Sequence, residues 1–153
     1  MMNYTQIDPI AVADVFLATQ ASSAAAAALA AKVNIAMRQF CQEIRIADGK
    51  EPDPALERDI EFQTAAKATA EARLADLSGR VTGLDVDAVV TNALVQQIDE
   101  WLRGMEVDHV QHGVHLAVAL SDEQVLASTM ARIEIEGSHA ALLTERAALE
   151  PSV

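Results

Sequence analysis

Three of the four histidines in the sequence lie in one short segment, DHVQHGVH at residues 108–115. Imidazole rings bind metals and transfer protons near neutral pH, so the cluster could serve either kind of chemistry. On a helix, however, the spacing of His109, His112 and His115 separates the outer two by about 120° and about 9 Å, too far to share one small ion. On a strand, His112 would face the side opposite the other two. The spacing therefore favours rings that contact solvent or a partner over a three-histidine metal site.

A second spacing is sharper, because it pairs carboxylates with imidazoles. Glu106 precedes His109 by three residues, and Glu136 precedes His139 by three, which places each pair on one face of a helix. If these segments form an antiparallel hairpin that turns at Ser121, the two glutamates each lie 15 residues from the turn and level with each other. The candidate metal ligands are thus Glu106, His109, Glu136 and His139, and the candidate metals are iron, manganese and zinc.

Glu-x-x-His is also the spacing with which ferritin-like bundles place di-metal ligands on facing helices. Such a site needs a bridging glutamate from each of two further helices. The level positions in the first half of the chain fall near Ala36 and Thr64, which carry no carboxylate. We therefore do not assign the chain to that family, and a ferritin-like di-metal carboxylate protein that binds or oxidises metal is kept as an alternative function.

Composition and charge limit the class of protein. A chain of 153 residues fits a single domain, 1–153, and its residues are 51% hydrophobic but only 3% aromatic, so the core must use small aliphatic side chains. The net charge of −12 repels phosphate backbones and anionic lipid, which argues against nucleic-acid and membrane partners. The single cysteine and an N-terminus without the basic start of a signal peptide lead us to expect a cytoplasmic protein.

Turn signals are few, and they divide the chain into long tracts. Prolines occur at positions 9, 52, 54 and 151, and apolar residues repeat at helical spacing between the breaks. Good N-cap residues precede the tracts at Asp8, Asp53, Asp85 and Ser121. The sequence predicts helices over about 9–47, 54–78, 85–120 and 122–149, which together form an all-α bundle of about four long antiparallel helices.

Two segments also fit a different secondary structure. From Val110 to Leu120, larger apolar residues alternate with smaller or polar ones, and RIEIE at 132–136 alternates in the same way. Alternation with a period of two is typical of a half-buried strand. An α+β fold with short strands near 110–120 and 132–136 is therefore the alternative architecture.

The first predicted helix carries a heptad seam from Val12 to Ala47, in alternating steps of four and three. Between Pro9 and Met37 the only charged residues are Asp14 and Lys32, too few for a helix with a free surface. We therefore expect this helix to pack at a tight interface between copies of the chain, a homo-oligomer. The predicted interface residues are Thr19, Ser23, Ala26, Ala30, Val33 and Met37.

No segment is diagnostic of catalysis. The six glycines are scattered rather than gathered in a phosphate loop, and the neighbours of Cys41, which are Phe40, Gln42 and Ile44, indicate a packed or groove-facing thiol without an adjacent base. We accordingly predict no catalytic or cofactor-binding residues and a non-enzymatic, self-associating structural or protein-interaction subunit. A second alternative is an acidic adaptor or chaperone for a secretion or virion component, which would offer the same uncharged helix to a different protein.

Overall fold

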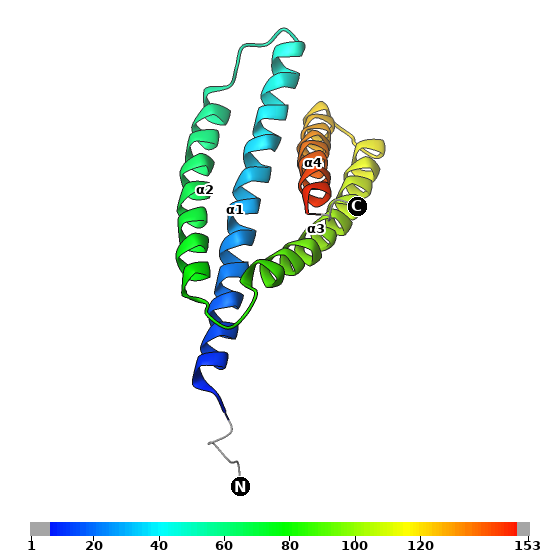
Figure 1. Ribbon diagram of the computed structural model, residues 1–153. Coiled ribbons are helices and arrows are strands. Elements are labelled where there is room, and N and C mark those ends of the chain that lie inside the picture. The colour runs from blue at the N-terminus through cyan, green and yellow to red at the C-terminus, as the bar shows by residue number, and fades with distance from the viewer. Residues whose placement is uncertain (1–6, 150–153) are drawn as a thin grey trace.

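A computed structural model describes residues 7–149 as four helices joined by short connections (Figure 1). They are α1 (Pro9–Ala47), α2 (Pro54–Arg80), α3 (Val86–Ala117) and α4 (Asp122–Ala148). The all-α four-helix architecture is confirmed, and the bounds agree closely with those read from the sequence. The described residues contain no strand.

Each helix begins at the side chain that the sequence marks as its cap. Asp8 Oδ1 accepts a hydrogen bond from Ile10 N at 2.9 Å, and Asp53 and Asp85 cap α2 and α3 in the same way. Ser121 Oγ accepts from Gln124 N at 3.2 Å, while Gln124 Oε1 accepts from Leu120 N at 2.8 Å. These side chains satisfy backbone donors that the first turn of a helix leaves without a partner, and so they fix where each helix starts.

The strand alternative is wrong at both segments. Residues 110–117 continue α3, only 118–121 leave the helix before α4 begins, and 132–136 lie inside α4. The valines that suggested a strand at 110, 114 and 118 also repeat every four residues. A helix satisfies its backbone hydrogen bonds within the segment itself, and the helical spacing of these residues prevails over their alternation.

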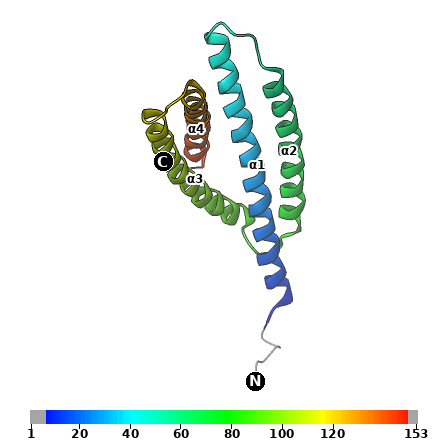
Figure 2. The same cartoon turned by 180° about the vertical axis from the view of Figure 1, so that it is seen from behind.

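The central helix of the fold is α1. Helix α2 packs along one side of it, and the antiparallel hairpin of α3 and α4 packs along another (Figures 1 and 2). Six of the ten buried residues of α1 are alanine, which lets neighbouring backbones approach closely. Larger core side chains gather where α1 meets the hairpin: Leu29, Val33, Ile98 and Leu142 are buried, and Leu94, Trp101, Leu102 and Met105 pack against them.

Two kinds of contact fix α4 against α1. Gly137 of α4 lies so close to Phe40 of α1 that a Cβ atom at Gly137 would meet Phe40 Cδ1 at 2.7 Å. Lys32 Nζ forms an ion pair with Glu145 Oε1 at 2.6 Å. The glycine therefore sets the distance between α1 and α4. The ion pair gives a partner to Lys32, one of the two charged residues in the tract between Pro9 and Met37.

The other charge of that tract, Asp14, is buried, with 5% of its surface exposed. Its carboxylate accepts hydrogen bonds from Thr82 N at 3.1 Å and Gly83 N at 2.7 Å, and Thr82 Oγ1 lies 3.5 Å away. Both amides belong to the connection between α2 and α3. Asp14 thus fastens that loop to α1, which explains a charge on the buried face of an otherwise uncharged helix.

Candidate functional site

The predicted heptad seam and the buried stripe of α1 lie on different faces of the helix. The buried stripe contains Ala18, Ala21, Ala25 and Ala28. Ser23, a seam residue two positions after Ala21, is exposed. A shift of two residues along a helix is a rotation of about 200°, so the two stripes point in nearly opposite directions. The intramolecular core therefore does not use the N-terminal half of the seam.

The six predicted interface residues divide accordingly. Thr19 and Ser23 are exposed, Ala26, Ala30 and Met37 are half-buried, and Val33 is buried in the core beside Leu29. The seam enters the bundle only in its C-terminal half. We use the term exposed seam for its N-terminal part, which consists of Val12, Phe16, Thr19 and Ser23.

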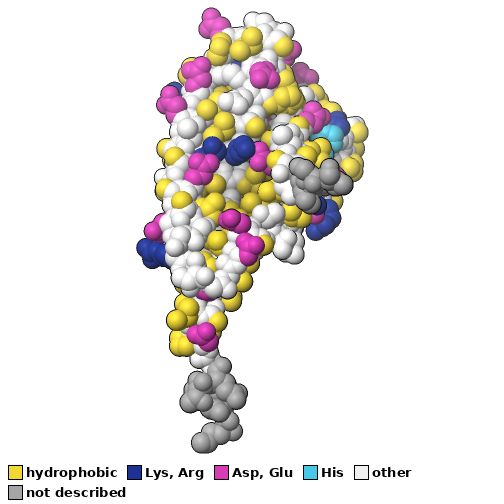
Figure 3. Space-filling view, viewed as in Figure 1, with side chains coloured by type: hydrophobic (Ala, Val, Ile, Leu, Met, Phe, Trp, Pro, Cys, Tyr) yellow, Lys and Arg dark blue, Asp and Glu magenta, His cyan; other side chains and the backbone are white. Residues whose placement is uncertain are grey.

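Large apolar side chains mark the N-terminal end of the exposed seam. Ile10, Val12, Val15 and Phe16 are all exposed, and Phe16 has 63% of its surface open to solvent. This end of α1 projects beyond the other helices in Figure 1, and Figure 3 shows hydrophobic side chains gathered on it. The surface is uncharged apart from Asp8 at the helix cap, because the carboxylate of Asp14 is turned to the loop.

By length and composition, α1 also meets the criterion for a helix that could cross a membrane. Core helices of soluble proteins meet the same criterion. In α1 the most apolar stretch has 28% of its residues buried inside the protein.

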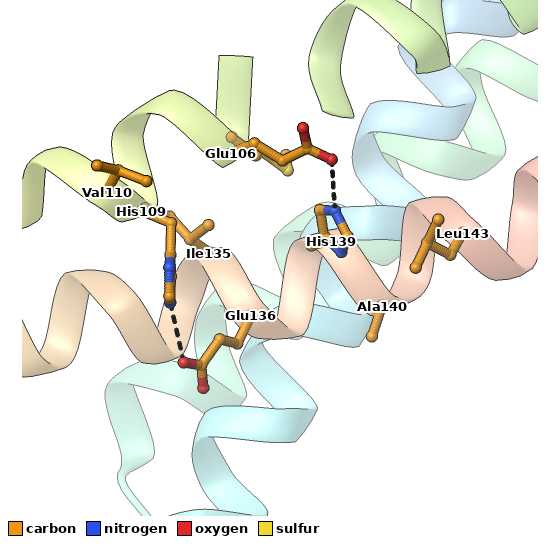
Figure 4. Close-up of a pocket in the computed structure, with 9 residues that line it drawn as sticks. Glu106, His109, Val110, Ile135, Glu136, His139, Ala140 and Leu143 are labelled. Carbon is orange, nitrogen blue, oxygen red and sulfur yellow. Dashed lines mark hydrogen bonds and ion pairs between the residues drawn. The ribbon is translucent and has the colours of Figure 1, made fainter. Parts of the chain in front are cut away.

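The four candidate ligands come together as two cross-helix pairs on the α3–α4 hairpin (Figure 4). His109 Nε2 of α3 lies 3.0 Å from Glu136 Oε1 of α4, and His139 Nε2 of α4 lies 3.6 Å from Glu106 Oε1 of α3. Each imidazole is half-buried and each carboxylate is exposed. The two glutamates are therefore not level with each other as the turn at Ser121 predicted, because each one contacts the histidine of the opposite helix.

A metal centre needs several ligands around one ion, whereas each contact here joins one imidazole and one carboxylate. Among residues 7–149, no group of three or more histidine, cysteine, aspartate or glutamate side chains lies close enough to hold one ion. Each imidazole instead has a single carboxylate partner. The other two histidines of the 108–115 segment contact each other, with ring centroids of His112 and His115 5.7 Å apart and nearly perpendicular.

The two His–Glu pairs lie on the wall of a groove that only α3 and α4 line. Its apolar part consists of Met105, Val110, Ile135, Ala140 and Leu143, and its volume is about 490 Å³. Val110 and Leu143 are exposed large hydrophobics. This groove was not predicted from the sequence, although Val107, Val110, Val114 and Val118 are exposed and follow helical spacing.

Cys41 has no arrangement suited to catalysis. The side chain is buried, and Sγ lies 3.9 Å from Met37 Sδ. Burial raises the pKa of the Cys41 thiol, Glu134 raises it further, and Arg38 opposes both. A nucleophilic cysteine needs a lowered pKa and access to substrate, so this thiol has the environment of a core side chain.

No protein-family model matches the sequence, and searches of curated proteins and of solved structures find no similar sequence or fold.

Proposed function

We propose that the protein is a non-enzymatic helical assembly subunit whose copies pair through the exposed seam of α1. The observation that carries this proposal is a stripe at heptad spacing, apolar or small and without charge, whose four side chains are exposed in the described chain. Ser23, at its C-terminal end, borders a groove against α2. An exposed heptad stripe of this kind is typical of a helix that packs against another helix.

The polar side chains of the exposed seam donate their hydrogen bonds within α1 and not to water. Thr19 Oγ1 donates to Val15 O at 2.9 Å, and Ser23 Oγ donates to Thr19 O at 3.3 Å. Both hydroxyl protons are therefore bonded within α1 itself. Burying these side chains against another helix leaves no donor unsatisfied, and their small size lets two backbones come close.

Electrostatics favour this face over the rest of the surface for contact between copies. Two chains of net charge −12 repel each other, and that repulsion is weakest where neither presents a charge. Asp14 is buried against the loop, and Lys32 is paired with Glu145, so neither lies on the exposed seam. A second copy brings an identical uncharged stripe, and a two-fold axis lets the same patch serve both partners.

The test is the mass of the protein in solution, measured by sedimentation velocity over a concentration series. We expect a dimer or larger species at micromolar concentration for the natural chain. Phe16→Glu places a charge in the exposed seam and should weaken association by about a hundredfold, since a desolvated charge in an apolar contact costs several kcal/mol.

Leu126→Glu is the matched control, because Leu126 of α4 has 61% of its surface exposed, close to the 63% of Phe16, but lies outside the seam. This variant should associate like the natural chain. A natural chain that stays monomeric at high micromolar concentration, or two variants that weaken association equally, would overturn the proposal.

A further inference from the structure

We infer that the groove between α3 and α4 is a docking site for a basic amphipathic helix of another protein. The groove presents an apolar floor of side chains from both helices, with Met105 and Ile135 half-buried and Val110 and Leu143 exposed. Glu106 and Glu136 stand beside this floor with exposed carboxylates. An apolar floor with acidic edges fits a partner that has an apolar stripe flanked by Lys or Arg.

The shape of the site favours a helix as the occupant. The groove runs between two antiparallel helices, and one more helix laid into it would complete a three-helix arrangement. Its volume of about 490 Å³ accepts a few large side chains that project from successive turns of such a helix. In Figure 4 His109 reaches from α3 to Glu136 of α4, and Glu106 of α3 points to His139 of α4.

The His–Glu pairs fix the acidic edges of the groove. His109 holds the Glu136 carboxylate at 3.0 Å, and His139 holds the Glu106 carboxylate at 3.6 Å, each across the hairpin. A carboxylate that is already oriented loses less conformational freedom when it meets a cation. Each exposed carboxylate also keeps a second oxygen that can accept from Lys or Arg.

A second copy of this chain fits the groove poorly. The exposed apolar end of α1 is not basic, since Asp8 is charged there and the first Lys or Arg along the chain, Lys32, is paired with Glu145. Two copies would also bring together net charges of −12. No residue of the exposed seam lines the groove, so this site is independent of the proposed self-association.

The experiment measures binding of two synthetic helical peptides to the full chain by fluorescence anisotropy. Both peptides carry the same leucine stripe, and one has lysine and the other glutamate on its polar face. We expect the lysine peptide to bind at micromolar concentration and the glutamate peptide to bind at least about tenfold more weakly, because acidic edges reject an acidic partner. Equal binding of the two peptides, or none of either, would overturn the inference.

Variants separate this groove from the general negative charge of the protein. The double variant Glu106→Gln with Glu136→Gln should weaken binding of the lysine peptide by about tenfold. The double variant Glu57→Gln with Glu61→Gln removes the same charge from exposed positions on α2 and should change it by less than about twofold. Equal losses in the two double variants would show that only net charge attracts the peptide.

The apolar floor has its own matched pair of variants. Val110 and Val118 are 66% and 64% exposed, and only Val110 lines the groove. Val110→Ser should weaken peptide binding, and Val118→Ser should leave it unchanged. Phe16→Glu should bind the peptide with full affinity, which distinguishes a failure at this groove from a failure of self-association through α1.

Discussion

Replacing Asp14 by alanine tests how the fold tolerates a buried carboxylate in its central helix. The change removes the acceptor for Thr82 N and Gly83 N, which Asp14 binds at 3.1 Å and 2.7 Å. A hydrogen bond to a charged group contributes about 1.5–3 kcal/mol. Thr82 and Gly83 are themselves exposed, so water replaces part of what is lost. We therefore expect the free energy of unfolding to fall by about 2–3 kcal/mol in total.

The measurement is urea unfolding followed by far-UV circular dichroism and by the fluorescence of Trp101, which packs against the core cluster. A loss of this size lowers Tm by roughly 5–10 °C for a chain of this length. Asp14→Asn keeps one side-chain oxygen as an acceptor but loses the charge, so its effect should be about half as large.

Asp108→Ala is the control for removing an aspartate from a helix of this protein, because Asp108 is exposed on α3. It should change the free energy of unfolding by less than about 0.5 kcal/mol, as is usual for surface positions. The reasoning is refuted if Asp14→Ala costs no more than Asp108→Ala, because the hydrogen bonds to the α2–α3 loop would then contribute nothing net.

Three further predictions concern the core. Gly137→Ala should destabilise the fold by about 1–3 kcal/mol in thermal unfolding because its Cβ would overlap Phe40, whereas Gly104→Ala, which meets nothing within 4 Å, should stabilise it by about 1 kcal/mol. Leu142→Ala should cost about 2–5 kcal/mol in urea unfolding, since Leu142 is fully buried. Burial raises the pKa of Cys41 above its ordinary 9.0. The stability that the protonated thiol contributes is therefore complete below pH 9.0 and is lost as the pH rises through the folded-state pKa. Urea unfolding of Cys41→Ala should lack this decline.

The helices could be predicted from the sequence because their signals are local. An N-cap side chain at Asp53 and a proline after it act within one turn, and so does the pairing of Ser121 with Gln124. The sequence also predicted the hairpin that brings the two Glu-x-x-His motifs together, since a short connection makes neighbouring helices antiparallel. What spacing alone did not give was the crosswise pairing, in which each glutamate contacts the opposite histidine and like charges stay apart.

The choice of the buried face of α1 could not be made from local signals. Two stripes of small or apolar residues run along the helix at similar spacing, one through Phe16 and Ser23 and the other through Ala18 and Ala25. Hydropathy favours burying the first stripe, because the second contains Asp14. The structure buries the second.

The reason lies far away in the sequence, since Asp14 is satisfied by backbone amides of Thr82 and Gly83 in the connection between α2 and α3. Once its charge is met by two N–H donors, burying that face costs little, and the alanines beside it allow three helices to approach. Phe16 and Val12 are then turned outward on the exposed seam. The same carboxylate that fastens the loop therefore leaves exposed the face through which we propose that copies assemble, and a fold that buried Phe16 instead would remove this face from the surface.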